Sequence, residues 1–239
     1  MQGIAAGFHP GKPNPVPGSG ILSIFRSVAR WNPLAQTFLV RRLILPAIVL
    51  LLLASGTSPV TAADRSSGEV RVLEGVSFPE RFEGPGVSLR LHNLALLRYK
   101  VIFRAYVAAL YLSEGADPGT VLADIPKRLE ISYFWAITAA DIGKAGEEIL
   151  ARNVAAATFS ALRSRLDRIR SAYRDVTPGD RYALTYRPGA GTELALNGKP
   201  LVVIEGEDFA AAYFSIWLGE KPLDRGLKDE LLRKGKGTS

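Results

Sequence analysis

Residues 93–112 carry the clearest hydrophobic pattern in the chain. From residue 97 onward every odd position is apolar or aromatic, whereas the even positions include Arg98, Lys100, Arg104 and Tyr106. Side chains alternate between the two faces of a strand, so the pattern predicts a long strand with a core face and a face that carries three cations and a phenol. The basic face is either a solvated outer face or the floor of a cleft for an anionic or phenolic ligand.

Similar alternation predicts further strands at residues 69–78, 87–92, 128–135, 182–186, 192–196 and 200–204. Asn197 and Gly198 separate the last two and predict a tight hairpin, because both residues tolerate positive φ. Apolar residues at helical spacing predict helices over residues 138–173, with a break near Asn153, and over 207–218 and 223–231. Strands, helices, hairpin strands and again helices, in this order, predict an α+β fold with helices on one face of an antiparallel sheet.

The first 62 residues have the pattern of an export signal. Arg41 and Arg42 precede an apolar run at residues 43–54, and small residues ending at Ala62 suit a signal peptidase. The run has 12 residues, fewer than the roughly 20 that a membrane span needs, although a membrane anchor is the alternative. Translation from near Val40 would leave residues 1–39 untranslated; otherwise they form a disordered leader. N-terminal sequencing of the exported protein would test cleavage after Ala62.

The same division of the chain changes the meaning of its charge. The net charge of +7 comes from 30 basic and 23 acidic residues, and five of the basic residues but no acidic one lie before residue 63. The remainder therefore carries 25 basic against 23 acidic residues, which gives little reason to expect nucleic-acid binding. We expect a leader at 1–62, a linker at 64–68, one domain at 69–232 and a basic disordered tail at 233–239.

Absent residue types exclude several chemistries. The chain has no cysteine, which excludes disulfides, thiol nucleophiles and cysteine metal sites. His92 is the one histidine after residue 62, so a Ser-His-Asp mechanism would need His92 as its base. We expect no metal and no cofactor.

Ordered short motifs from residue 69 to residue 232 resemble the bacterial chalcone isomerase-like family. They lie at residues 93–112, 179–180, 188–192, 196–198, 204–206, 208–209, 216–222, 227–228 and 231–232. The resemblance implies a chalcone isomerase-like open-faced β-sandwich, in which a large curved antiparallel sheet carries a layer of helices on one face. It also implies a ligand cleft between the sheet and the helices.

The resemblance gives only partial support for isomerase chemistry. Chalcone isomerase needs cations or hydrogen-bond donors near a phenolate and a developing enolate. Arg98 matches the arginine of the plant enzymes, but Ile142 falls where their tyrosine belongs and Ile216 where they have serine or threonine. No catalytic residue is therefore assigned, and we expect no chalcone cyclisation.

The resemblance also implies a set of binding residues. Family members that bind fatty acids hold the carboxylate with an arginine and a tyrosine, which suits Arg98 and Tyr106. The predicted ligand-binding residues are Arg98, Tyr106, Tyr133, Asn153 and Ser215.

Three hypotheses about function follow. The first is an exported binding protein for a small amphipathic carboxylate such as a fatty acid, with no stable membrane span after cleavage. The alternative is an intramolecular lyase or isomerase that acts on a chalcone-like or other enone substrate. The third is a structural role in an envelope assembly.

Overall fold

The structure, a computed structural model, describes residues 69–99 and 103–234. The predicted signal peptide and most of the predicted tail lie outside these residues, and so do Lys100 and the rest of 100–102. The strands are β1 (Val70–Leu73), β2 (Val76–Pro79), β3 (Arg81–Gly84), β4 (Val87–Tyr99), β5 (Phe103–Leu112), β6 (Lys127–Tyr133), β7 (Arg181–Arg187), β8 (Gly191–Leu196) and β9 (Lys199–Ile204). The helices are the 3-10 helix η2 (Pro118–Thr120) and the α-helices α2 (Ala139–Asn153), α3 (Ala156–Ala161), α4 (Arg163–Ala172), α5 (Glu207–Leu218) and α6 (Arg225–Leu232).

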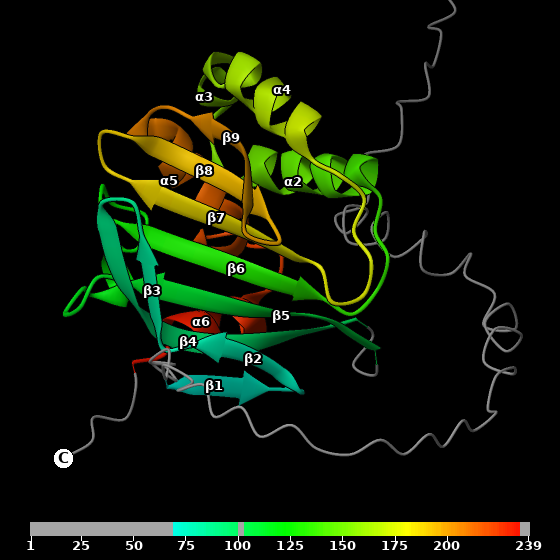
Figure 1. The fold of residues 1–239 in the computed structure, drawn as a ribbon. Coiled ribbons are helices and arrows are strands. Elements are labelled where there is room, and N and C mark those ends of the chain that lie inside the picture. The colour runs from blue at the N-terminus through cyan, green and yellow to red at the C-terminus, as the bar shows by residue number, and fades with distance from the viewer. Residues whose placement is uncertain (1–68, 100–102, 235–239) are drawn as a thin grey trace, which may run out of the picture.

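The predicted α+β architecture is confirmed. Strands β3 to β9 form one seven-stranded sheet in chain order, and each neighbouring pair is antiparallel. The sheet is curved, α5 and α6 lie behind it in Figure 1, and the small β1–β2 hairpin lies at its other side. Among the described residues, no helix is long and apolar enough to cross a membrane.

Local sequence signals explain several element boundaries. Asn197 and Gly198 form the two-residue turn between β8 and β9 with φ values of 50° and 77°, as the hairpin signal predicts. The Thr138 hydroxyl accepts a hydrogen bond from the backbone N–H of Asp141 and caps α2. Helix α2 ends at Asn153, where the sequence predicts a break.

The prediction of one long strand within residues 93–112 is wrong, because β4 ends at Tyr99 and β5 begins at Phe103 and runs antiparallel to it. From Ala105 onward both faces of β5 are buried, which differs from the predicted single core face. Tyr106, Ala108, Leu110 and Leu112 belong to the main core between sheet and helices. Val107, Ala109 and Tyr111 belong to a second core beneath the β1–β2 hairpin. The residues of the predicted basic side do not share one face: Arg98 and Arg104 bond to Glu74 on the hairpin side, whereas Tyr106 faces the helices.

Two irregularities in the β4–β5 ladder decide which residues reach which core. The pairing shifts register between Leu91 and Asn93, and again between Leu97 and Arg98. At each shift one strand contains one residue more than its partner, and this extra residue lets neighbouring side chains change face. Leu97 and Tyr106 form a cross-strand pair that faces the helices, and the second shift then pairs Arg98 with Arg104 on the hairpin side.

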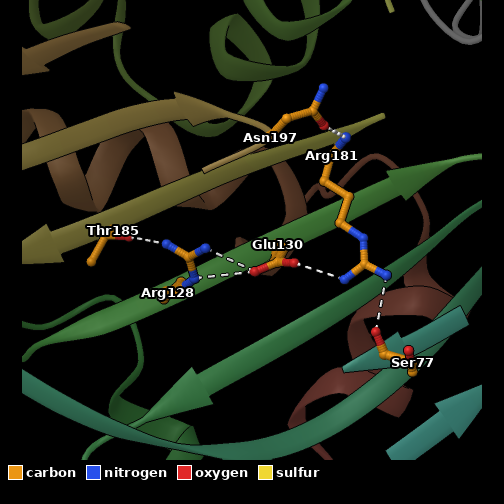
Figure 2. Close-up of polar contacts among 6 residues, drawn as sticks. All are labelled: Ser77, Arg128, Glu130, Arg181, Thr185 and Asn197. Carbon is orange, nitrogen blue, oxygen red and sulfur yellow. Dashed lines mark hydrogen bonds and ion pairs between the residues drawn. The ribbon is translucent and has the colours of Figure 1, made fainter. Parts of the chain in front are cut away.

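A buried charge network lies on the sheet face opposite the helices (Figure 2). Glu130 accepts hydrogen bonds from Arg128 at 2.8 Å and from Arg181 at 3.1 Å. Arg128 also donates to the Thr185 hydroxyl at 2.7 Å, and Arg181 donates to the Ser77 carbonyl at 2.9 Å. Because Ser77 belongs to β2, this network attaches the small hairpin to the sheet.

Glu130→Ala should lower the free energy of unfolding by about 3 kcal/mol, because two largely buried guanidinium groups would lose their shared carboxylate. Glu114→Ala is the matched control, since Glu114 pairs with Arg90 at 3.7 Å and its side chain is 70% exposed. Urea unfolding followed by circular dichroism measures both variants. Equal unfolding midpoints for Glu130→Ala and the wild type would contradict a structural role for the network.

Candidate ligand-binding cleft

A cavity of about 60 Å³ lies between the sheet and the helices. Its walls come from three neighbouring strands, from α2 and from α5. The lining residues are Leu97, Ala105, Tyr106, Ile131, Tyr133, Ile137, Ile142, Ala145, Gly146, Ile149, Tyr173, Tyr213, Ile216, Trp217 and Leu223. None of these described lining residues is charged, so the cavity is a mostly apolar site with phenol groups.

The sheet supplies the tyrosine floor of the cavity. Tyr106 of β5 lies opposite Tyr133 of β6 in the strand register, and their rings meet edge to face with centroids 5.8 Å apart. This geometry suits aromatic pairs. The predicted alternation of β6 is correct, since Leu129, Ile131 and Tyr133 all lie in the main core.

Helix α2 forms one side of the cavity with a stripe of small and aliphatic residues. Ile142, Ala145 and Ile149 share one face because they are three or four residues apart. Gly146 leaves additional space at this side of the cavity, since a Cβ atom there would lie 3.7 Å from Ile216 Cδ1 and 3.9 Å from the Tyr213 hydroxyl. Ile142, Gly146 and Trp217 are only partly buried, which places the opening of the cavity between α2 and α5.

The tyrosine hydroxyls differ in their hydrogen bonding. The Tyr173 and Tyr213 hydroxyls bond to each other at 2.7 Å. The Tyr106 hydroxyl is buried and has no hydrogen-bond partner among the described residues. The Trp217 indole is near enough to lower the pKa of Tyr106 in opposition to burial, but it lies outside hydrogen-bonding geometry. Tyr106 therefore presents a free donor at the cavity.

Burial keeps all four phenols neutral. It is the main cause that raises the pKa of Tyr106, Tyr133, Tyr173 and Tyr213 above the ordinary tyrosine value. Each phenol thus remains protonated at neutral pH and can donate a hydrogen bond.

The prediction that Arg98 faces this cleft is wrong. Arg98 is exposed and donates to Glu74 at 3.0 Å, and Arg104 donates to the other oxygen of the same carboxylate at 3.1 Å. Glu74 lies in the β1–β2 turn, on the side away from the helices. The parity argument assumed that residues 98 and 106 belong to one strand, whereas Arg98 lies on β4 and Tyr106 on β5. Because Leu97 is the partner of Tyr106, the next residue, Arg98, faces the other side of the sheet.

Of the other predicted residues, the structure brings Tyr106 and Tyr133 together in the cavity and leaves Asn153 and Ser215 outside it. Asn153 ends α2, where its amide donates to the Lys221 carbonyl at 2.8 Å and accepts from the Lys221 N–H at 2.9 Å. The Ser215 hydroxyl donates to the Ala212 carbonyl within α5. Both side chains satisfy backbone groups, and Ile216 occupies the cavity-facing position next to Ser215.

Lys127, a buried cation of β6, is not among the residues that line the cavity. Its side chain is fully buried at the start of β6. The ammonium donates to the Ala123 carbonyl at 2.6 Å and to the Ile125 carbonyl at 3.2 Å. Burial lowers the pKa of Lys127 to about 8, and its bonds hold the loop before β6.

Sequence reasoning missed Tyr173, Tyr213 and Trp217 as cavity residues. Helical spacing predicted only core packing for these segments, which is correct for the buried Tyr173 and Tyr213, whereas Trp217 is partly buried. The available signal was that tyrosines, which need hydrogen-bond partners, stand where leucine or phenylalanine would fill a core.

These features define an α+β protein with a mostly apolar cavity between a curved sheet and a helix layer. A family model for chalcone isomerase-like proteins matches residues 70–233. The chain therefore belongs to the chalcone isomerase-like family. No curated protein sequence matches the chain.

A solved structure supports the fold. The chain is similar to the crystal structure of a fatty-acid binding protein of Arabidopsis thaliana, with a TM-score of 0.56 and 16% sequence identity. The match covers 69% of this chain and 96% of the plant protein chain. At this level of identity, the likeness establishes the shared fold.

Asn153→Ala should lower the free energy of unfolding by about 2 kcal/mol, because the two hydrogen bonds between the Asn153 side chain and the Lys221 backbone are lost. Arg152→Ala, at an exposed position in the same helical turn, is the control and should unfold like the wild type. Thermal unfolding of the ligand-free proteins provides the comparison. If Asn153→Ala instead leaves stability intact and weakens ligand binding, the assignment of Asn153 to the fold is wrong.

Proposed function

We propose that this protein binds a small amphipathic lipid, a fatty acid or a close derivative, in the cavity between sheet and helices and does not transform it. The main observation behind this proposal is an apolar cavity whose lining includes Tyr106, a phenol with a buried hydroxyl that is unpartnered among the described residues. Such a combination of apolar walls and few polar groups is typical of small-molecule sites. The fold that the chain shares with a fatty-acid binding protein supports this choice of ligand.

The size and position of the cavity fit the entry of an alkyl chain. About 60 Å³ is room for only a few water molecules, so a lipid would occupy this space and widen it by moving lining side chains. Trp217 at the opening has two flexible side-chain torsions and is only partly buried. Each methylene that leaves water contributes about 0.8 kcal/mol, which makes the chain the main source of affinity.

The enzyme alternative finds less support in the cavity. Cyclisation of a chalcone requires charge stabilisation at the phenolate and the enolate. Ile142 and Ile216 line the cavity at the positions where the resemblance implies a tyrosine and a serine or threonine. Arg98, the matching cation, points elsewhere.

A direct binding measurement tests the proposal. The fluorescence of cis-parinaric acid or of its methyl ester should rise when the probe is mixed with the protein. Ala145→Leu should fill the cavity and lower the affinity for the tighter-binding probe at least tenfold. Ala151→Leu, an exposed position on the same helix, should bind like the wild type. No fluorescence gain with either probe, or equal binding by the two variants, would refute the proposed site.

Purified protein should cyclise 2′-hydroxychalcone no faster than buffer alone, because the described lining residues offer no cation to the phenolate. The absorbance of the chalcone measures the rate, and a plant chalcone isomerase serves as the positive control. Turnover that Tyr106→Phe abolishes would restore the isomerase alternative.

A further inference from the structure

We propose that the cavity selects lipids whose head group is an uncharged hydrogen-bond acceptor, such as an ester or a protonated acid, and that the Tyr106 hydroxyl donates the hydrogen bond that positions this head. The inference rests on the proposed function, because it specifies the head group of the lipid that the same cavity binds.

The first support is the charge of the cavity. All described lining residues are apolar or aromatic, and the arginine that would match a carboxylate, Arg98, bonds to Glu74 on the other side of the sheet. A carboxylate that leaves water without a cation or several donors loses its hydration and gains little in return. An ester carbonyl has a much smaller hydration to lose.

The second support is the free donor. The Tyr106 hydroxyl is buried without a partner among the described residues, whereas the Tyr173 and Tyr213 hydroxyls are bonded to each other. A buried donor without an acceptor is unfavourable, and a ligand oxygen placed there would remove the penalty. Tyr106 has one O–H to donate, which fits a single acceptor oxygen.

The third support is the sign of the charges around the cavity. Asp224 caps α6 with its carboxylate, which accepts from the Leu227 N–H at 2.7 Å, and it raises the pKa of Tyr106. Glu147 on α2 acts in the same direction on the pKa of Tyr213, although it is paired with Arg163 and Arg170. Two carboxylates that destabilise a phenolate in the cavity also destabilise a bound carboxylate.

A competition series tests the choice of head group with a constant alkyl chain. Methyl dodecanoate and dodecanoic acid compete with methyl parinarate for the full-length protein at pH 8, where the free acid is ionised. We expect the ester to compete at least tenfold better than the acid. Equal or tighter binding of the ionised acid would overturn the head-group inference while leaving lipid binding in the cavity intact; no binding of any probe would overturn both.

The role of Tyr106 has a matched control on the same strand. Tyr106→Phe should lower the affinity for methyl dodecanoate about fivefold, which is in the range expected for the loss of one neutral hydrogen bond. Tyr111→Phe should change nothing, because the Tyr111 hydroxyl is another buried group without a partner but belongs to the core under the hairpin. Unchanged ester affinity in Tyr106→Phe would contradict the hydrogen bond.

Thermal stability distinguishes a lost ligand hydrogen bond in Tyr106→Phe from misfolding of this variant. The ligand-free Tyr106→Phe variant should melt at the wild-type temperature or above it, because removing a buried unpartnered hydroxyl removes a desolvation penalty. If Tyr106→Phe melts lower than wild type and Tyr111→Phe does not, the Tyr106 hydroxyl has a partner within the protein and the proposed head-group contact is wrong.

Discussion

The pairing of β4 with β5 determines the chemistry of this molecule. Leu97 of β4 pairs with Tyr106 of β5, so Arg98, the next residue on β4, lies on the opposite face. Leu97 packs with Tyr106 toward the helices, and Arg98 bonds to Glu74 of the hairpin turn. The extra residue Ala105 of β5 places Arg104 on the hairpin side as well, although Tyr106 faces the cavity.

The polar groups that are buried on the two faces of the sheet are consequently of different kinds. On the hairpin side, Glu130 is shared by Arg128 and Arg181, so charge is balanced by charge. On the helix side, polar groups in the cavity are neutral phenols, which can lie among apolar side chains at a far smaller desolvation cost than ions. The hairpin side is therefore held in place by ion pairs and hydrogen bonds, and the helix side forms a cavity without charged lining residues among those described.

The fold could be predicted from the sequence to a large extent, whereas the site could be predicted only in part. Helical spacing and the Asn197–Gly198 turn are local signals, and local signals gave the correct elements. Tyr106 and Tyr133 were identified through the family resemblance and do lie together. The prediction for Arg98 failed because the alternating pattern does not reveal that β4 ends at Tyr99 and that β5 begins at Phe103. The Tyr173–Tyr213 bond joins residues 40 positions apart through packing that no local pattern encodes.

Membership of a family that includes catalysts does not carry their chemistry to this cavity. A cleft that contained a desolvated cation would obtain much of its affinity from the head group of an anionic ligand. With Ile142 and Ile216 in the walls and a neutral phenol as donor, most of the affinity for the proposed lipid ligand would come from its alkyl chain, at about 0.8 kcal/mol for each buried methylene. A neutral head group would add one hydrogen bond and fix the orientation of the ligand, whereas a charged head group would weaken its binding. A binder of the proposed kind would therefore discriminate among lipids by chain length and by the absence of charge, which is a different selectivity from that of a carboxylate receptor on the same scaffold.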